Sequence, residues 1–257
     1  MRISCCAYSY RQALQAGTLS LFDFIQLCRE IGFDGVELTS YYFATTERSY
    51  LNEVKRFCHK EGVLISGTAV GNNFANTDAT ERRKHVDMTK SWIDHSVVLG
   101  APTIRVFAGH LNKETVREEA FQNVAEALKE CAEYAWERGI LLALENHDGL
   151  TATGADVLRL YHAVDHKGLG INADMGNFVG NIYPEIEIVA PYSVATHAKV
   201  TARGAETGTH FPVDYKTVRT ILDNANYRGW IAVEYEDQEP ADEAVPRFFT
   251  ELQSAFA

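Results

Sequence analysis

The sequence lacks an excess of basic residues and has no long apolar run. Its 24 lysines and arginines are outnumbered by 35 aspartates and glutamates, which gives a formal net charge of −11 at pH 7. Nucleic-acid backbones and anionic membranes attract clustered positive charge, so neither is expected as the main partner. No stretch approaches the roughly 18 apolar residues of a membrane span, and the apolar N-terminal run is too short for a secretory signal. We therefore expect a cytoplasmic enzyme of small molecules.

Cysteine is scarce, and its arrangement excludes two common uses. The five cysteines are odd in number and contain no Cys-x-x-Cys spacing, which argues against a disulfide framework and against a zinc ribbon. They fall at positions that look apolar within predicted strands or helices, so we expect reduced thiols in the core and a reducing compartment. These residues are Cys5, Cys6, Cys28, Cys58 and Cys131.

The sequence also lacks linkers, low-complexity tracts and charge blocks, so one domain suffices. No Gly-x-Gly-x-x-Gly motif follows the first strand, which disfavours a dinucleotide-binding sheet. What the chain does contain is eight short apolar segments alternating with helical patterns, about one unit per 32 residues. Its 257 residues match the usual size of an eightfold barrel, about 250 residues. The fold class predicted is α/β, a single (β/α)8 TIM barrel over residues 1–257. The predicted strands are residues 2–8, 35–38, 63–70, 103–107, 141–144, 169–174, 193–200 and 230–234.

The helical patterns between these strands are mostly closed by glycine, which favours the left-handed conformation that ends helices. The fourth predicted helix runs over residues 113–138 and stops at Gly139, and a later one is capped at Asp214. In the last helix, Phe248, Phe249 and Phe256 recur at helical spacing and are predicted to face the core.

Ionisable residues stand at the ends of four successive strands. The apolar run 141–144 leads straight into Glu145, and a carboxylate there is costly to bury unless something pairs with it. Asp174, His197 and Glu234 end or nearly end the next three strands. Because the carboxyl ends of barrel strands open on one face, these four side chains should meet. Three carboxylates and one imidazole suit Mn²⁺, Mg²⁺, Co²⁺ or Zn²⁺. The alternative is that each is a separate structural residue, paired with a lysine or a helix dipole.

Several stretches, in this order along nearly the whole chain, carry a family resemblance. The chain resembles the sugar phosphate isomerase/epimerase family of xylose isomerase-like TIM barrels. The matching stretches are Gly32-Phe33-Asp34-Gly35-Val36-Glu37-Leu38, Ile104-Arg105-Val106-Phe107-Ala108-Gly109, Glu145-Asn146-His147, Asp174-Met175-Gly176-Asn177, His197-Ala198-Lys199 and Tyr227-Arg228-Gly229-Trp230-Ile231-Ala232-Val233-Glu234-Tyr235-Glu236.

The resemblance implies one divalent metal ion, Mn²⁺ before Mg²⁺, Co²⁺ or Zn²⁺, held by Glu145, Asp174, His197 and Glu234. It implies chemistry that begins with proton removal from the carbon next to a carbonyl, through an enediolate. Glu145 and Glu234 are the predicted catalytic acid/base pair, because they lie three strands apart and can flank a bound sugar. The expected substrate is a small keto-sugar or a related polyol.

Five further residues are candidates for substrate binding: Asn73, Arg105, His147, Lys199 and Arg203. Lys199 lies on the same strand face as His197, so it is expected to neutralise an oxyanion or a ligand carboxylate, with a plain structural ion pair as the alternative. Arg105 sits within a strand and is expected to pair with a carboxylate such as Glu37 or to reach the substrate. His147 is equally compatible with supporting a metal ligand. Arg203 and His210, in a glycine-rich loop, are candidates for a lid, and His110 lies in a loop at the same mouth.

Two departures from the family pattern leave the reaction type open. Asn177 stands where many members have His, and Val200 stands where many have Asp. Beside an isomerase or epimerase, a dehydratase or lyase that expels water or an aglycone fits the same residues. A metal-dependent nuclease is disfavoured by the negative charge, and a barrel that only binds a ligand remains a further alternative. No glycine-rich phosphate cradle is visible, and the sequence is compatible with a homo-oligomer without predicting one.

Overall fold

The computed structural model describes residues 1–256 and contains a closed barrel of eight parallel strands. The strand order around the barrel is β1-β10-β7-β6-β5-β4-β3-β2, so neighbours in the chain are neighbours in space. All eight predicted strands are present, which confirms the (β/α)8 prediction. Their bounds are β1 (Arg2–Cys6), β2 (Gly35–Thr39), β3 (Leu64–Ala69), β4 (Thr103–Val106), β5 (Leu141–Glu145), β6 (Leu169–Asp174), β7 (Ser193–Ala198) and β10 (Trp230–Val233).

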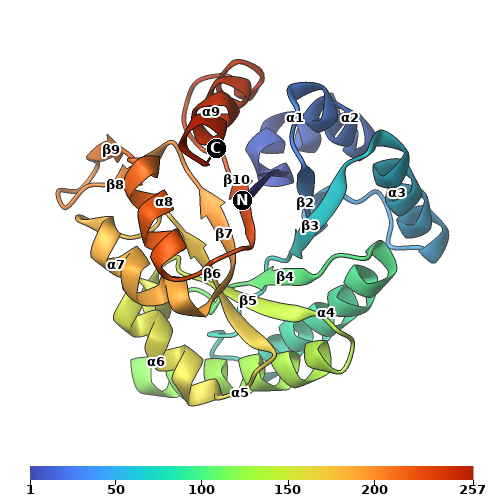
Figure 1. Cartoon of the computed structure of the whole chain (residues 1–257). Helices are drawn as coiled ribbons and strands as arrows, with labels where there is room; N and C mark the ends of the chain where they lie inside the picture. The colour runs from blue at the N-terminus through green and yellow to red at the C-terminus, as the bar shows by residue number, and fades with distance from the viewer. Residues whose placement is uncertain (257) are drawn as a thin grey trace.

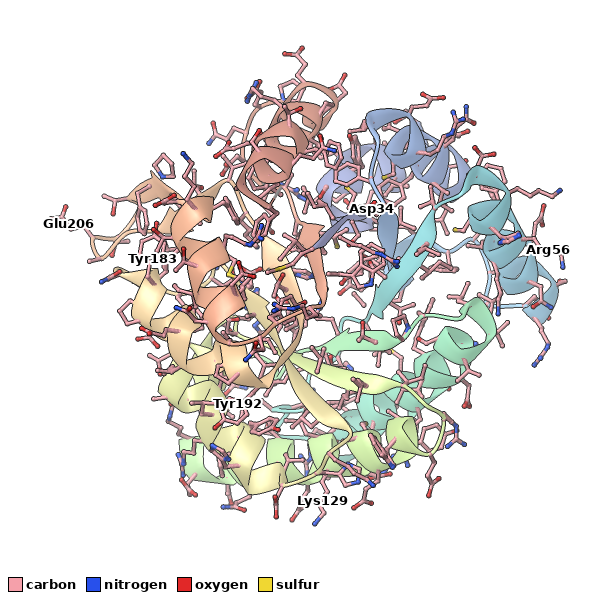
Figure 2. The ribbon with its side chains drawn as sticks, in the orientation of Figure 1. Asp34, Arg56, Lys129, Tyr183, Tyr192 and Glu206 are labelled. Atoms are coloured by element: carbon pink, nitrogen blue, oxygen red, sulfur yellow. The ribbon has the colours of Figure 1, made fainter. Side chains whose placement is uncertain are left out.

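Helices surround the barrel on its outside, as Figure 1 shows. Charged side chains of these helices, such as Arg56 and Lys129, point outward (Figure 2), which leaves the apolar helix faces for the barrel. The α-helices are α1 (Arg11–Ala16), α2 (Leu21–Ile31), α3 (Arg48–Glu61), α4 (Ala79–Leu99), α5 (Arg117–Trp136), α6 (Gly154–Val164), α7 (Ile182–Val189), α8 (Tyr215–Asn224) and α9 (Ala241–Phe256). The 3₁₀ turns are η1 (Ala7–Tyr10), η2 (Ser40–Tyr42), η3 (Gly149–Thr151) and η4 (Ala190–Tyr192).

Three predicted elements differ from the structure by two residues or more at one end or both, and the other strand bounds agree within one residue. The first strand ends at Cys6, because the chain turns into η1. The fourth predicted helix begins at Arg117 rather than at residue 113: the Asn112 side chain accepts from the backbone N–H of Glu114 at 3.0 Å, a local turn that competes with helix. The seventh strand ends at Ala198, and the chain then forms a two-stranded antiparallel hairpin, β8 (Thr201–Arg203) with β9 (His210–Pro212).

The core contains the apolar faces that the sequence predicts. Phe248, Phe249 and Phe256 are buried, which confirms their predicted orientation. All five cysteines are free and buried, as predicted. Among the helices of residues 1–256, none combines the length and the apolar character that a bilayer crossing requires.

A register shift between β6 and β7 determines which side chains meet at the barrel mouth. Ile171 pairs with Ser193, but Asn172 pairs with Ala195, so β7 carries one extra residue, Val194. A shift of one residue exchanges the two faces of a strand, and here it brings His197 opposite Asp174. Gly170 makes this possible, because a Cβ atom at that position would lie 2.5 Å from the Val194 side chain.

Candidate metal centre

The four predicted metal ligands come together at the carboxyl end of the barrel. Glu145 ends β5, Asp174 ends β6, His197 lies near the end of β7, and Glu234 directly follows β10. All four are buried, and one donor atom from each lies within 4.8 Å of the others. The strand order places β5, β6, β7 and β10 side by side, so the carboxyl ends of four adjacent strands build one site.

The Nδ1 atom of His197 is the centre of this group. It lies 3.4 Å from Glu145 Oε2, 3.7 Å from Asp174 Oδ2 and 3.4 Å from Glu234 Oε2. Donors that bind one ion at about 2.0–2.1 Å lie about 3.3 Å apart in tetrahedral geometry, so these separations suit a shared cation. His197 Nδ1 and Asp174 Oδ2 are also buried without a hydrogen-bond partner, and of the two only Asp174 Oδ2 has the Lys199 ammonium nearby, at 3.4 Å. A buried nitrogen lone pair that no donor engages is costly, and a metal ion would satisfy it. The residues present therefore fit a divalent ion.

Glu37 is a site residue whose role the sequence reasoning missed. Its Oε1 atom lies 3.0 Å from His197 Nε2, and both side chains are buried. A carboxylate accepts hydrogen bonds, so in the neutral imidazole this contact puts the proton on Nε2 and leaves the Nδ1 lone pair facing the other three side chains, where it can bind a cation. An available signal was that Glu37 is the only charged residue in an otherwise apolar strand, Gly35–Thr39.

Glu145 lies among hydrogen-bond donors. Arg105 Nε lies 3.1 Å from Glu145 Oε2, so Arg105 pairs with Glu145 rather than with Glu37, the partner suggested by the sequence. The guanidinium is fixed further by a 3.0 Å hydrogen bond from Nη1 to the Val70 carbonyl. Asn172 donates to Oε2 at 3.1 Å, and Asn177 donates to Oε1 at 3.3 Å. Asn177 thus supports a predicted metal ligand.

The two predicted catalytic carboxylates differ in their electrostatic surroundings. Burial raises the pKa of Glu145 to about 8, with Arg105 opposing this change. Burial also acts to raise the pKa of Glu234, but the positive charges of His197 and Lys199 prevail and hold it well below the usual range. Burial disfavours the charged form of His197, but the three surrounding glutamates raise its pKa well above its ordinary value. When no metal ion is bound, the protonated imidazole of His197 therefore balances part of the negative charge of the surrounding carboxylates.

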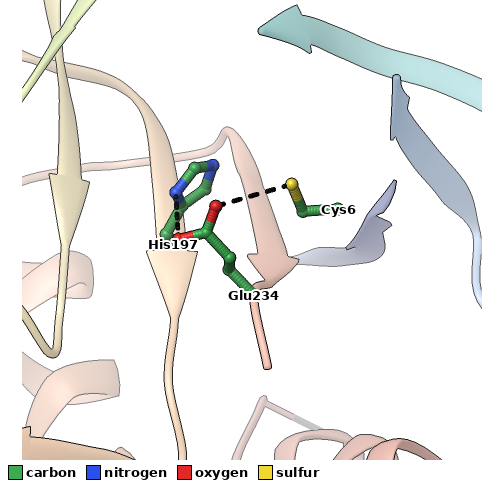
Figure 3. A group of neighbouring side chains, drawn as sticks. All are labelled: Cys6, His197 and Glu234. Atoms are coloured by element: carbon green, nitrogen blue, oxygen red, sulfur yellow. Dashed lines mark hydrogen bonds and ion pairs between the residues drawn. The ribbon is translucent and has the colours of Figure 1, made fainter. Parts of the chain in front are cut away.

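Cys6 and Lys199 contact the opposite sides of Glu234. Figure 3 shows Glu234 between His197 and Cys6, whose Sγ atom lies 3.7 Å from Glu234 Oε1. Burial raises the pKa of the Cys6 thiol well above its usual range, so the neutral S–H donates to the carboxylate. Lys199 Nζ lies 3.1 Å from Glu234 Oε2 and 3.4 Å from Asp174 Oδ2, and it also pairs with Glu236. Lys199 therefore neutralises carboxylates of this group, an arrangement that fits both the predicted neutralisation of metal ligands and the alternative of a structural ion pair.

A cavity of about 210 Å³ opens beside the four-residue centre. Two of the predicted ligands, Glu145 and Glu234, lie in its wall, together with aromatic, cationic and imidazole side chains. The wall is formed by Tyr8, Tyr41, Arg105, Phe107, His110, Glu145, His147, Lys199, Glu234 and Glu236.

The five substrate-binding candidates divide into two groups. Arg105, His147 and Lys199 lie in the cavity wall. Asn73 and Arg203 do not: Asn73 Oδ1 accepts from the backbone N–H of His110 at 3.2 Å, and Arg203 lies in the β8–β9 hairpin, with Nη2 3.5 Å from Asn177 Oδ1. Both stand near the mouth, in positions that support neighbouring loops.

A family profile described as "Xylose isomerase-like TIM barrel" matches residues 25–252. The chain therefore belongs to this family, as the resemblance implied. A search of curated proteins found no match.

Solved structures share the fold at low sequence identity. A D-psicose 3-epimerase from Clostridium cellulolyticum H10, crystallised with D-tagatose, is 15% identical with a TM-score of 0.79, covering 100% of this chain and 99% of that one. A 3-keto-D-glucoside 4-epimerase from E. coli is 17% identical with a TM-score of 0.76, at 91% and 94% coverage. A probable 3-DHS dehydratase from Bacillus anthracis is 17% identical with a TM-score of 0.78, at 98% and 99% coverage.

Proposed function

We propose that this protein is a divalent-metal-dependent sugar isomerase or epimerase that removes a proton from the carbon next to a carbonyl. The observation that carries the proposal is the convergence of Glu145, Asp174 and Glu234 on the free Nδ1 atom of His197, beside a cavity. If the cluster were purely structural, the buried atoms His197 Nδ1 and Asp174 Oδ2 would be expected to have hydrogen-bond partners, and they have none.

The metal would be held by Glu145, Asp174, His197 and Glu234. This oxygen-rich set with a single nitrogen suits Mn²⁺ best, and Mg²⁺, Co²⁺ or Zn²⁺ also fit. When bound, such an ion polarises a carbonyl and stabilises the negative charge that develops on the oxygens during proton removal.

The proton itself would be moved by two of the three glutamates in the cavity wall, Glu145 and Glu234. Glu145 and Glu234 come from strands on either side of the centre, so a substrate in the cavity has a carboxylate close to each face. Arg105, Asn172 and Asn177 orient Glu145, and Lys199 orients Glu234. One carboxylate takes the proton from one face, and the other returns a proton to the same carbon from the opposite face, which inverts that carbon. If the proton is returned to the neighbouring carbon while the adjacent hydroxyl passes its proton to the former carbonyl oxygen, the carbonyl moves by one position.

The cavity favours an unphosphorylated, monosaccharide-sized substrate. Its volume, about 210 Å³, lies below the roughly 300–1,000 Å³ of pockets for drug-sized ligands. Both cationic side chains of its wall already pair with carboxylates, Arg105 with Glu145 and Lys199 with Glu234 and Glu236, so neither is available for a phosphate. Aromatic rings from Tyr8, Tyr41 and Phe107 can pack against the C–H face of a sugar. Two of the similar solved structures, the D-psicose 3-epimerase and the 3-keto-D-glucoside 4-epimerase, add support.

A proton-exchange assay tests the proposal. The Mn²⁺-loaded protein is incubated in D₂O with ketohexoses and with 3-keto-hexosides, and deuterium incorporation and products are followed by NMR. We expect exchange at the carbon next to the carbonyl, with an epimer or isomer as product. Glu145→Gln should abolish exchange, while Glu130→Gln, whose carboxylate on α5 pairs with Arg83 and Lys90 of α4 and does not line the cavity, should leave it unchanged.

Two other outcomes would redirect or reject the proposal. Exchange accompanied by loss of water or of the aglycone would identify the dehydratase or lyase alternative and reject isomerisation. No exchange with any of these sugars, with metal bound at the centre, would reject enolisation chemistry on such substrates.

A further inference from the structure

A second group of metal-ligating side chains lies at the cavity mouth, outside the four-residue centre. It consists of His110, from the loop after β4, and His147 and Asp148, from the loop after β5; we name it the mouth cluster. His110 Nδ1 lies 3.4 Å from one oxygen of Asp148, and His147 Nδ1 lies 3.4 Å from the other. One donor atom from each residue lies within 4.8 Å of the other two.

The backbone of each loop in the mouth cluster is fixed by its own hydrogen bonds. Asn73 Oδ1 accepts from the N–H of His110 at 3.2 Å. Thr151 Oγ1 accepts from the N–H of His147 and donates to the Asp148 carbonyl, both at 3.2 Å. The two imidazoles therefore converge on Asp148 from a framework that does not depend on the contact itself.

Two glycines bring the loops close together. Gly109, beside His110, has φ +108°, and a Cβ atom there would lie 2.1 Å from Asn73 Oδ1. Gly149, beside Asp148, has φ +53°, and a Cβ atom there would lie 3.2 Å from the Leu111 side chain. Because L side chains rarely adopt these conformations, glycine is required at both positions for this approach.

We propose that the mouth cluster is a second metal site, selective for imidazole-preferring divalent ions such as Zn²⁺. Two histidines and one carboxylate form the three-ligand set of an open zinc site. Donors at about 2.0–2.1 Å from zinc lie about 3.3 Å apart, and each imidazole lies 3.4 Å from a different oxygen of Asp148, so small movements of exposed side chains would bring all three onto one ion. The four-residue centre, with three carboxylates, is the harder site and suits Mn²⁺ or Mg²⁺. The two sites therefore differ in the ions that they select.

The position of the mouth cluster gives the second ion a defined place in the molecule. His110 and His147 both lie in the wall of the cavity that also contains Glu145 and Glu234. Three protein ligands leave a coordination position for water or for a hydroxyl group of a molecule at the entrance. Zinc binding here needs no assumption about the reaction, so the proposal stands independently of the proposed function.

Zinc titration of the chelated full-length protein, by isothermal titration calorimetry, tests the second site. We expect two Zn²⁺ per wild-type chain, and one per chain for His110→Ala and for Asp148→Asn. Asp174→Asn, which removes an oxygen from the four-residue centre, should retain the site that His110→Ala loses. His59→Ala, an exposed histidine on α3, is the matched control and should still bind two. His110 is 68% exposed, so its removal should leave the melting temperature of the chelated protein unchanged.

The stoichiometries also separate failure of this proposal from failure of the proposed function. One Zn²⁺ per wild-type chain that survives His110→Ala but is lost in Asp174→Asn would overturn the second site and leave the first intact. One Zn²⁺ that is lost in His110→Ala alone would support the mouth cluster and count against the four-residue centre. Equal loss of zinc in His59→Ala and His110→Ala would indicate adventitious surface binding and overturn the proposal.

Discussion

Glu37→Gln tests whether the buried partner of His197 sets the metal affinity of the four-residue centre. The substitution keeps the size of the side chain but replaces a charged acceptor by an amide that can either accept or donate. Glu37 Oε1 lies 3.0 Å from His197 Nε2 with both groups buried, so no water can take its place. We expect that the imidazole will no longer prefer the tautomer with its proton on Nε2. Nδ1 will then carry the proton part of the time and bind the metal ion less tightly.

The expected magnitude follows from the effect of similar partners elsewhere. Loss of a carboxylate behind a metal-ligating histidine reduces metal affinity about 10–100-fold, which corresponds to about 1.4–2.7 kcal/mol. The Glu37 contact should reach the upper half of this range, because it is charge-assisted and fully enclosed. Since Gln preserves packing, the fold should survive.

Mn²⁺ titration of the chelated protein, followed by electron paramagnetic resonance of the free ion, measures this effect. The matched control is Asp237→Asn, close to Glu234 in the chain, where the carboxylate accepts from Thr201 Oγ1 and touches no predicted ligand. Circular dichroism and urea unfolding establish that both variants fold. A folded Glu37→Gln that binds Mn²⁺ as tightly as the wild type would refute the orienting role of Glu37.

Three further predictions concern stability. Gly170→Ala should lower the free energy of unfolding in urea by about 1–3 kcal/mol, because the added Cβ would lie 2.5 Å from the Val194 side chain. An unchanged urea midpoint would show that the β6–β7 register shift does not need glycine. Chelation should lower the melting temperature: Mn²⁺ at 100 times its dissociation constant adds about 2.7 kcal/mol, and a melting temperature indifferent to Mn²⁺ would contradict a bound ion. Hydrogen bonds from Arg83 lower the pKa of Glu130 to about 2, although burial opposes the shift and Lys90 adds to it. The folded-state pKa lies below the ordinary value, so this stabilisation is present above about pH 4.5 and is lost as pH falls toward 2. Because the Glu130 side chain is 40% exposed, we discount the shift to about 1 kcal/mol; Glu130→Gln should lose that much at pH 7, and an equal gap from wild type at pH 7 and at low pH would contradict it.

The fold and three of the four predicted metal ligands could be predicted together, because both depend on local sequence patterns. Buried parallel strands are short apolar runs, and the barrel topology forces their ends together however far apart they lie in the chain. Glu145, Asp174 and Glu234 stand at such ends, so their convergence needed no side-chain geometry.

What could not be predicted depends on register and on pairing between distant strands. The extra residue on β7 that brings His197 opposite Asp174 leaves no mark in the hydrophobic pattern. The sequence predicted that Arg105 pairs with a carboxylate, which is confirmed, but Glu37 was the wrong example: the partner is Glu145, and strand-end patterns do not show which of two buried carboxylates a distant guanidinium reaches. Cys6 looked like any core thiol, and its contact with Glu234 joins residues 228 positions apart.

The most direct test of the metal centre is a crystal structure of the Mn²⁺-soaked protein with anomalous data collected near the manganese edge. We expect one strong anomalous peak at about 2.0–2.3 Å from an oxygen or nitrogen atom of each of Glu145, Asp174, His197 and Glu234. Glu37 should still accept the hydrogen bond from His197 Nε2. A structure at millimolar Mn²⁺ without a peak among these four side chains would contradict the account.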